Sequence, residues 1–448
     1  MEEEKTKKKR KKKAAEGDGE KEHRKNWREV NATPAEIKAF LSDHIYLRYN
    51  MVKHCNEVRL PPEDPFCGNS ELSQFVSDDW QPLSDRLTNT LKNALCDLKP
   101  TLKRDLQDVL DSGYVTVYHP FRFYLNRLPP WDGLDYILEL SMSVSVKGGV
   151  EQQLLFADYL KRWLVAMVAS WLDEGVVNQA VLVLIGEQGL YKTTWFSRLL
   201  PPELRSYFRI KVKSNKVEKD DLIALSQYGL VCCEELDVMR PSEVNTMKTI
   251  VTMPAIDERI PYGRHPEHMQ HVASFCGTGN NPLFLNDPTG SRRWLPFEVE
   301  NIMSPRDNPF NYEGIYSQAY ALYQEGFRYW FSPQEIRDQS RHNSQFETPK
   351  DEMELVDYFF RRPVDTDAGE FMPTAIAQQI VSSLGTRVST VALGRAFRKL
   401  GFESATIDNS RGYIVVRRLD EERKARAHSL VYEIRHKEIQ ITDDTDVY

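Results

Sequence analysis

The sequence predicts an α/β protein with a parallel β-sheet at its centre, and three observations lead to that prediction. Short apolar runs at residues 181–185, 230–233 and 272–276 have the length and composition of buried strands. Helical patterns lie between these runs, and each run ends in a polar loop. Because chemistry in open α/β sheets gathers at the carboxyl ends of the strands, we expect the three loops to form one site.

The loop after the first run has the features of a phosphate-binding loop. Gly186 and Gly189 are followed by Lys192 and Thr193, and a helical pattern then runs from 195 to 200. Loop amides and the helix N-terminus attract phosphate oxygens, while the lysine reaches the outer phosphates and the threonine ligates Mg²⁺. The alternative is a chance glycine turn between a strand and a helix. The predicted nucleotide-binding residues are Gly186, Glu187, Gln188, Gly189, Leu190, Tyr191, Lys192, Thr193 and Thr194.

One position departs from the usual spacing of such loops. Tyr191 stands where the second glycine is expected. Glycine at that position lets the backbone approach phosphate without an intervening Cβ. We therefore expect the tyrosine to fit only if its backbone dihedral angles are ordinary and its ring turns outward.

The second apolar run ends in two carboxylates, Glu234 and Glu235. Hydrolysis of a nucleotide needs a carboxylate that holds the metal through water and one that orients the attacking water. Adjacent strand residues point to opposite faces, so only one of the pair faces the phosphate unless the strand has already ended. We favour Glu235, because Asp237 would share its face. The alternative is an exposed acidic strand end.

Two further predicted catalytic groups lie beyond the third apolar run. Asn280 suits a hydrogen bond to the attacking water or the γ-phosphate, although an asparagine in a turn before Pro282 is a common placement. Arg292 and Arg293 are adjacent in a glycine-containing loop, which suits an arginine finger supplied to a neighbouring subunit. The sequence does not separate the two arginines, and a basic surface pair is the alternative.

Residues 259–271 lie between the second and third runs. His265, His268 and His271 are each three positions apart, but no cysteine or other regular ligand spacing supports a zinc site. We favour a loop or hairpin that contacts nucleic acid, because arginine binds phosphate and tyrosine offers a stacking face. The residues predicted to contact DNA there are Arg259, Tyr262, Arg264 and His265.

Composition limits the classes of protein that fit. The 448 residues suggest two to four domains at roughly 150 residues each. A net charge of −7 argues against a uniformly basic nucleic-acid binder. The six cysteines contain no CxxC pair, which is typical of reduced thiols in the cytosol. The charged start and the shortness of every apolar run predict a cytoplasmic protein that does not enter the membrane.

Shifts in composition divide the chain into six segments. The predicted segments are a basic tail at 1–26, a mostly helical domain at 27–150, the nucleotide-binding core at 151–300, a connector at 301–350, a small domain at 351–420 and a charged tail at 421–448. The basic tail fits a loose DNA-binding arm as well as it fits a solvated tail or a truncated linker. A nuclear signal has no other support.

The small domain has the pattern of a winged helix-turn-helix. Helical patterns at 374–384 and 390–400 are followed by a hairpin that turns near 408–412. The second helix carries Arg395, Arg398 and Lys399, which could face DNA. The alternative is a winged helix that binds protein and merely exposes these basic residues.

From about residue 50 to residue 299 the chain resembles the virulence-associated E family, a group related to superfamily 3 helicases of phages and plasmids. The order and spacing of the motifs carry the resemblance: the loop with Lys192 and Thr193, then Glu235, then Asn280, then Arg292 and Arg293. Lys248 and Arg259 also fit the pattern. The C-terminal region resembles a small domain often appended to such proteins in Bacteroides-like mobile elements.

The resemblance implies a P-loop NTPase core of the AAA+ or superfamily 3 helicase-like type, with ATP and Mg²⁺ as cofactors. It also implies a homo-oligomeric, usually hexameric, ring that moves along single-stranded DNA during replication of a phage or mobile element. In this scheme Lys192 and Thr193 bind ATP-Mg²⁺, Glu235 serves hydrolysis, Asn280 is a sensor and Arg292 or Arg293 is the finger. Many relatives carry a primase domain upstream. No paired-acidic primase motif precedes the core, so we expect a separate primase or polymerase as partner.

Two main hypotheses for function follow. The first is an ATP-driven DNA helicase or translocase, which the near-complete set of hydrolytic residues favours. The second is an ATP-binding, DNA-binding module that initiates replication or regulates a mobile element without processive unwinding, which Tyr191 and the winged-helix pattern favour. A metabolic kinase would need neither the paired arginines nor a terminal winged helix.

Overall fold

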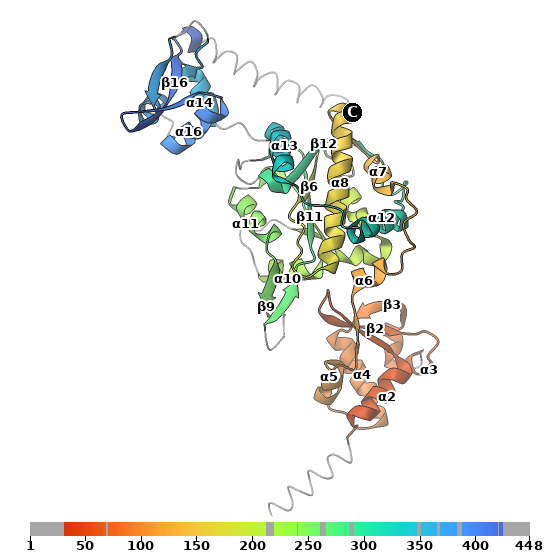
Figure 1. The fold of residues 1–448 in the computed structure, drawn as a ribbon. Coiled ribbons are helices and arrows are strands. Elements are labelled where there is room, and N and C mark those ends of the chain that lie inside the picture. Colours follow the sequence, from red (N-terminus) through yellow and green to blue (C-terminus); the bar gives the residue numbers. More distant parts are fainter. Residues whose placement is uncertain are drawn as a thin grey trace, which may run out of the picture. The chain divides into compact units, whose positions relative to one another are not determined.

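The computed structural model divides the chain into two compact units, Met1–Phe346 and Glu347–Tyr448 (Figure 1). The residues that the structure describes are 31–68, 70–211, 219–239, 241–259, 266–282, 284–285, 291–346, 351–364, 368–382, 388–419 and 421–423. The predicted tails at 1–26 and beyond 423 lie outside them.

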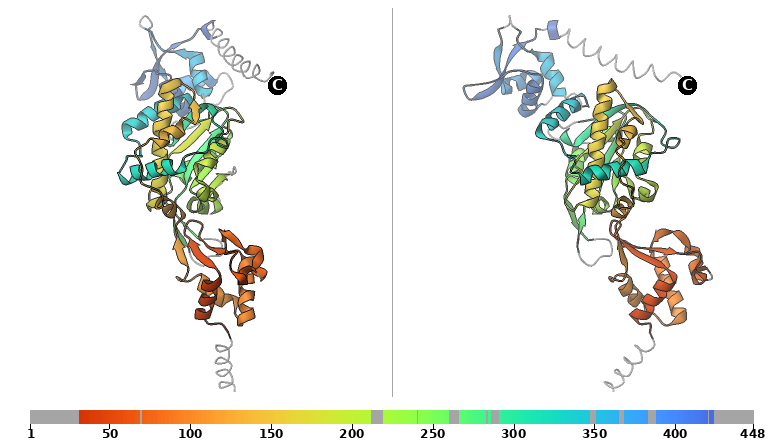
Figure 2. Two further views of the ribbon diagram at one scale, coloured as in Figure 1. Left: turned by 90° about the vertical axis from the view of Figure 1, so that its right-hand side faces the viewer. Right: turned by 45° about the vertical axis from the view of Figure 1, so that its right-hand side comes forward.

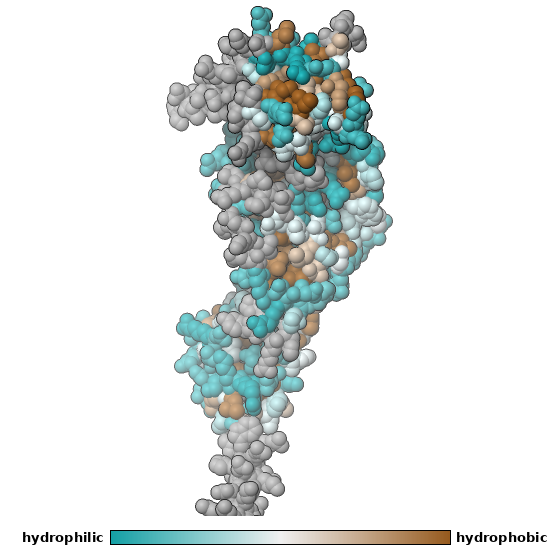
Figure 3. All heavy atoms as spheres, turned by 90° about the vertical axis from the view of Figure 1, so that its left-hand side faces the viewer, coloured by the Kyte–Doolittle hydropathy of each residue, from teal (hydrophilic) through white to brown (hydrophobic). Residues whose placement is uncertain are grey.

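The first unit begins with helices packed on one face of a four-stranded sheet of order β3-β2-β1-β4. The helices are α2 (Pro34–His44), α3 (Pro65–Gly68), η1 (Glu71–Phe75), α4 (Asp85–Leu98) and α5 (Lys103–Leu110). The strands are β1 (Tyr46–Asn50), β2 (Cys55–Leu60), β3 (Ser77–Pro82) and β4 (Thr116–Tyr118). Hydrophilic residues cover most of this segment on the side that carries α5 (Figure 3).

This sheet is a difference from the mostly helical segment that the sequence predicts. Only the extended piece at 57–60 is anticipated, and it lies in β2. The outer strand β3 reads Ser-Asp-Asp-Trp-Gln-Pro, with little apolar alternation to mark it as a strand. Its pairing with β2 is set by tertiary contact, which overrides local propensity.

The central sheet of the first unit has six strands in the order β5-β12-β6-β11-β8-β7. The strands are β5 (Val144–Val146), β12 (Trp294–Ile302), β6 (Val181–Ile185), β11 (Ser274–Gly279), β8 (Leu230–Cys233) and β7 (Phe208–Lys211). The strands from β12 to β7 are parallel to one another, and β5 is antiparallel to β12. The mixed α/β fold is therefore confirmed. The apolar runs at 181–185 and 230–233 are β6 and β8, and the run at 272–276 begins two residues before β11 and overlaps it.

Helices cover both faces of this sheet (Figures 1 and 2). Alternation along β6 sends Leu182 and Leu184 into one core and Val181, Val183 and Ile185 into the other, so every residue of the strand is buried. On the first face lie α6 (Pro120–Leu125), α7 (Tyr136–Ser141), α8 (Gly149–Leu172), α9 (Lys192–Leu199), η2 (Pro202–Tyr207) and α12 (Tyr312–Gln324). On the second lie α10 (Lys219–Gln227) and α11 (Pro241–Val251).

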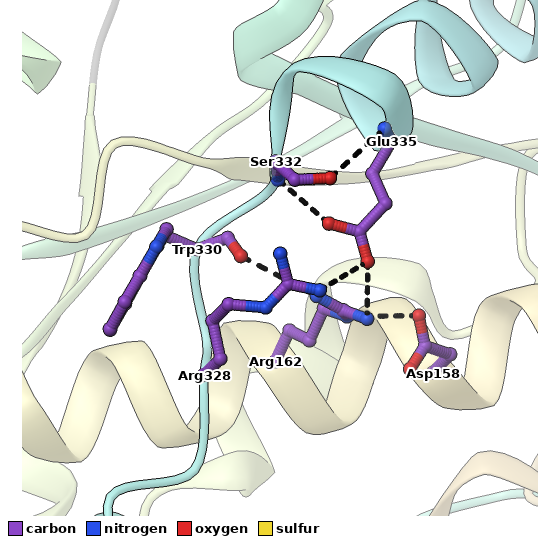
Figure 4. Close-up of polar contacts among 6 residues, drawn as sticks. All are labelled: Asp158, Arg162, Arg328, Trp330, Ser332 and Glu335. Atoms are coloured by element: carbon purple, nitrogen blue, oxygen red, sulfur yellow. Dashed lines mark hydrogen bonds and ion pairs between the residues drawn. The ribbon is translucent and has the colours of Figure 1, made fainter.

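A network of ion pairs joins α13 (Pro333–Asn343) to α8 (Figure 4). The Glu335 carboxylate accepts hydrogen bonds from Arg162 at 3.0 Å, Arg328 at 2.8 Å and the Ser332 amide at 2.7 Å. Arg162 also pairs with Asp158 at 3.0 Å. On the same helix, Gln339 donates to the carbonyl of Arg292 at 3.0 Å. The network therefore positions the segment that carries the paired arginines.

A hairpin projects between the second and third parallel strands. It is formed by β9 (Ala255–Glu258) and β10 (Glu267–Gln270), which pair antiparallel. The sequence predicts a loop or hairpin here, and residues 260–265 between the two strands lie outside the described residues.

The second unit combines helices with a small sheet. Its elements are α14 (Asp351–Phe359), β13 (Phe360–Arg361), β14 (Glu370–Pro373), α15 (Thr374–Ser382), α16 (Thr390–Lys399), β15 (Ser404–Ile407) and β16 (Ser410–Arg417). Tyr413 stacks on Phe397 with ring centroids 4.7 Å apart and donates to the Gly394 carbonyl at 2.7 Å. The β15–β16 turn places Asp408 and Asn409 at positive φ, as a two-residue hairpin requires.

None of the helices in the described ranges is long and apolar enough to cross a membrane.

Candidate nucleotide-binding site

The loop between β6 and α9 closes tightly against the neighbouring strands. The Gly186 amide donates to the Gly279 carbonyl of β11 at 3.1 Å. A Cβ on Gly186 would lie 2.9 Å from the Val299 carbonyl oxygen of β12, so only glycine fits there without a backbone shift. Gly189 has φ +94°, in the region that favours glycine. Both glycines are therefore required by the backbone of the loop.

Tyr191 adopts the conformation of the glycine it replaces. Its φ of 58° and ψ of 15° lie in the left-handed region, so the expectation of ordinary dihedral angles is wrong. The side chain is 44% exposed, as the expectation of an outward ring requires. The Tyr191 carbonyl accepts from the Trp195 amide at 2.7 Å, which closes the first turn of α9. The loop thus keeps its shape at a cost of about 1–2 kcal/mol for one left-handed residue.

Lys192 points into the loop. The side chain is buried, and its Nζ donates to the carbonyls of Gly186 at 2.5 Å and Glu187 at 2.6 Å. A longer contact of 3.4 Å joins Nζ to Oδ1 of Asn280 at the end of β11. Burial lowers the pKa of Lys192, and the nearby Asp237 and Glu187 oppose that shift. The structure therefore brings together Lys192 and Asn280, which the sequence predicts for one site.

Thr193 contacts the first of the two glutamates. Its Oγ1 donates to Oε1 of Glu234 at 2.7 Å. The strand β8 ends at Cys233, and Glu235 is an exposed, left-handed residue with φ 53° that precedes η3 (Leu236–Val238). The alternation used to favour Glu235 therefore does not apply, because the strand has ended before the pair. Glu234 is the carboxylate that the fold brings to Thr193.

Asp237 is a member of this site that the sequence treats only as a neighbour of Glu235. Its Oδ2 accepts from the Asn281 amide at 3.2 Å. Its Oδ1 is buried and, within the described residues, has no hydrogen-bond partner. An added Cβ on Gly279 would lie 3.2 Å from that oxygen, so glycine there leaves room for the carboxylate. The signal for this in the sequence is Gly279 itself, immediately before Asn280.

The oxygen atoms gathered here suit a hard divalent cation. Thr193 supplies a hydroxyl, Glu234 a carboxylate and Asp237 a buried carboxylate oxygen that has no hydrogen-bond partner in the part of the chain that the structure describes. Mg²⁺ is held in such sites by one or two carboxylates together with substrate phosphates and water. The residues present therefore fit the predicted metal.

The paired arginines lie at the amino ends of the parallel strands, opposite the end that carries the loop. They belong to η4 (Ser291–Arg293), immediately before β12, and Trp294 pairs with Val181 at the start of β6. The loop between β6 and α9 begins after the other end of β6, five residues away, which is about 16 Å at roughly 3.3 Å per residue. The pKa of Arg293 is lowered mainly by burial and, to a smaller extent, by the charge of Arg292. The pKa of Lys248 on α11 is lowered mainly by burial and, to a smaller extent, by the charge of Arg293. Arg293 and Lys248 thus lie near enough to repel each other, at the opposite end of β6 from the loop.

The predicted DNA contacts fall into two groups. Arg259 is exposed after β9, while Tyr262, Arg264 and His265 lie outside the described residues. Arg395, Arg398 and Lys399 are all exposed on α16, with Arg398 also donating to the Gly394 carbonyl at 3.1 Å.

The two histidines of the spaced triplet that the structure describes have different surroundings. His268 is exposed and pairs with Asp257 across the hairpin at 2.7 Å. His271 is buried, and its Nδ1 donates to the Met253 carbonyl at 2.7 Å. The third histidine, His265, lies outside the described residues.

Comparison with known families places the chain. The family model of the virulence-associated protein E-like domain matches residues 125–348, half of the chain, and the chain belongs to this family. Solved structures of the NrS-1 C-terminal region are similar to it. For one apo structure the TM-score is 0.44 and the sequence identity is 11%, and the match covers 86% of this chain and 99% of the NrS-1 chain. An A-form apo structure has a TM-score of 0.47 at 10% identity, with coverage of 85% and 98%. No curated protein matches the chain.

Proposed function

We propose that this chain is a P-loop ATPase that couples ATP hydrolysis to movement along single-stranded DNA in the replication of a phage or mobile element. The observation that carries the proposal is the meeting of Lys192, Thr193 and Glu234 at the carboxyl edge of a parallel sheet. Ligands in open α/β folds bind at this edge, where the strand order reverses. Membership of the virulence-associated protein E-like family supports the replication setting.

In this proposal each residue has a distinct task. The amides of the loop and the N-terminus of α9 bind phosphate oxygens, and Lys192 moves from its carbonyl partners to the outer phosphates. Mg²⁺ neutralises charge on the transferred phosphoryl group. Thr193, with Glu234 behind it, orients the metal. Glu235 and Asn280 hold the attacking water.

The placement of the arginines supports a ring. At about 16 Å from the loop of their own subunit, Arg292 and Arg293 are remote from the phosphates they would stabilise. A head-to-tail contact places them against the loop of the next subunit, and contacts of this kind close into rings. We infer a homo-oligomer, with a hexamer as the expected form and a separate primase or polymerase as its partner in the cytoplasm.

Two parts of the chain are proposed to contact DNA. The hairpin of β9 and β10 carries Arg259, followed by Tyr262, Arg264 and His265, whose side chains offer charge and stacking. The second unit has the helix, helix and hairpin order of a winged helix, with Arg395, Arg398 and Lys399 exposed on α16.

The second candidate is an ATP-dependent binding module that does not turn over. It is favoured by Tyr191, because an exposed side chain on a left-handed residue sits in the loop that must approach phosphate. The two candidates differ only in hydrolysis, since both need the nucleotide site and a DNA contact.

ATP hydrolysis by the purified chain, with and without single-stranded DNA, separates them. The comparison is with Lys192→Ala and with Lys92→Ala, a lysine of α4 remote from the loop. Turnover that DNA stimulates and that Lys192→Ala alone abolishes supports the motor. Nucleotide binding without turnover supports the module, and neither binding nor turnover contradicts both.

A further inference from the structure

The two faces of the sheet in the N-terminal segment carry different side chains. Val58 and Leu60 of β2 point into the core formed with α2, α4 and α5. The register between β1 and β2 sets Tyr46 opposite Arg59 and Arg48 opposite Glu57, so these four residues share the other face. That second face is rich in aromatic and arginine side chains.

These side chains form an alternating row, which we call the arginine–aromatic row. The Arg48 guanidinium lies 3.6 Å from the ring centroid of Tyr118 and 4.1 Å from that of Trp80. The Arg59 guanidinium lies 5.9 Å from Trp80 and 4.4 Å from Tyr46. These contacts therefore link Tyr118, Arg48, Trp80, Arg59 and Tyr46, which together come from all four strands.

The row continues beyond the sheet onto α6. Phe123 meets Tyr118 edge to face, with ring centroids 5.3 Å apart. The Arg127 guanidinium lies 5.2 Å from the centroid of Phe123. The aromatic rings at the two ends are half-exposed, with Tyr46 at 49% and Phe123 at 48%.

The two arginines of the sheet differ in what neutralises them. Arg48 pairs with Glu57 at 2.6 Å and lies against the rings of Trp80 and Tyr118. We infer that its charge stabilises the fold and does not bind a ligand. Arg59 has no carboxylate within ion-pair distance among the described residues, and its buried Nε has no hydrogen-bond acceptor there. A guanidinium beside open aromatic rings and without an acid partner is suited to an anion that also stacks.

We propose that the arginine–aromatic row binds single-stranded nucleic acid, with bases stacked on Tyr46, Trp80 and Phe123 and phosphates held by Arg59 and Arg127. Non-specific single-strand sites combine these two elements, because every base has a π-face and every linkage carries a negative charge. Flat sheets with exposed aromatic side chains are a known platform for unstacked bases. A duplex is not the ligand, since its bases are already stacked on one another.

The acidic residues of the segment limit the path of the strand. Asp78 and Asp79 are exposed on β3, the edge strand beside β2. Phosphates running along that edge would be repelled, so β3 is proposed to contribute only the Trp80 ring, and the phosphates are proposed to lie toward Arg59 and Arg127. The inference rests on the proposed function only in the choice of DNA as the nucleic acid.

The test is binding of a fluorescent oligo(dT) of about 20 nucleotides to the full chain without nucleotide, followed by anisotropy. Tyr46→Ala and Trp80→Ala are each expected to weaken binding about fivefold or more, the effect of one lost stacked base. Arg59→Ala is expected to weaken binding. It is also expected to reduce the slope of log affinity against log salt concentration by about one, the effect of one counterion fewer released. Tyr46→Phe and Trp80→Phe keep a stacking ring and are expected to bind like the parent.

Trp330→Ala is the matched control, because Trp330 is 58% exposed and belongs to the segment before α13. Equal affinity of the parent, Tyr46→Ala and Trp80→Ala would overturn the proposal, as would equal competition by a duplex of the same length. Absence of binding by the parent would also overturn it.

ATP hydrolysis without and with single-stranded DNA is measured on the same proteins. Its absence under both conditions in the parent chain would contradict the proposed ATPase, whereas its presence with unaltered DNA binding in the variants would contradict the arginine–aromatic row alone. The two failures are therefore distinguishable.

Discussion

The Thr193 hydroxyl donates to the Glu234 carboxylate at 2.7 Å. This contact joins α9, the helix that follows β6, to the end of β8, a strand that is not adjacent to β6 in the sheet. The strand β11 lies between β6 and β8, and its own end carries Asn280. Lys192, the residue before Thr193, contacts Oδ1 of Asn280 at 3.4 Å, so three segments distant in sequence meet at this end of the sheet.

The two glutamates are predicted to have separable effects. Glu234→Gln removes the carboxylate behind Thr193, so we expect ATP binding to need about 10- to 100-fold more Mg²⁺. Glu235→Gln is expected to leave ATP binding intact and to lower turnover by about 10²–10⁴-fold. Titration of ATP binding against Mg²⁺, beside steady-state hydrolysis, measures both. The reverse assignment would show that the attacking water lies at Glu234.

Replacement of Tyr191 tests the left-handed backbone at that position. Tyr191→Gly removes backbone strain of about 1–2 kcal/mol from the folded state. It also raises the conformational entropy of the unfolded chain, which costs about 0.4–1 kcal/mol of stability. The free energy of unfolding should therefore rise slightly or stay unchanged. Tyr191→Val is expected to be less stable than the parent, because a β-branched residue tolerates positive φ poorly. Urea unfolding provides the comparison. A Val variant as stable as the parent would mean that the loop relaxes to an ordinary conformation.

Subunit mixing tests the placement of the arginines. Lys192→Ala and Arg293→Ala are each expected to be inactive, the second by about 10³-fold or more if Arg293 is the finger. In mixed rings, roughly a quarter of the heterologous interfaces would join an intact loop to an intact arginine, so activity should partly return. The same mixing with Arg292→Ala identifies which arginine acts. Failure of every mixture to recover would place the arginines outside the neighbouring site.

A pH effect is expected from His119, whose Nδ1 accepts from the Arg122 amide at the start of α6. Burial, followed by Arg122, lowers the pKa of His119 from 6.5 to about 4. The folded state therefore prefers the neutral ring. The contribution of His119 to the free energy of unfolding is complete above pH 6.5 and is lost as the pH falls toward 4. His119→Asn keeps the cap without titrating in this range.

The measurement is the urea midpoint between pH 7.5 and pH 4.5. His119→Asn should lose less stability than the parent over this window, while His268→Asn, at an exposed position, should follow the parent. Parallel curves for the parent and His119→Asn would contradict a buried neutral histidine.

The elements that the sequence predicts best are those with strong local signals. The strands at 181–185 and 230–233 are continuous apolar runs, and β6 and β8 match their bounds. The glycines that the loop backbone requires are also visible in the sequence. The turn at Asp408 and Asn409 is visible for a similar reason, since it sits between the strands β15 and β16.

What the sequence does not predict depends on contacts between distant segments. The polar strand β3 forms only against β2, and the arginine–aromatic row exists only once four strands are aligned. The choice between Glu234 and Glu235 depends on the exact residue at which β8 ends, and a sequence pattern does not locate the end of an element to one residue. Asp237 is revealed by its approach to Gly279, a contact that no local pattern contains.

The most direct test of the account is calorimetric titration of the purified chain with ATP, with and without Mg²⁺, beside Lys192→Ala. The account predicts Mg²⁺-dependent binding of one ATP per chain and its loss in the variant, because Lys192 is the cation buried in the loop. Unchanged affinity in Lys192→Ala, or no binding by the parent chain, would contradict a nucleotide site between β6 and α9.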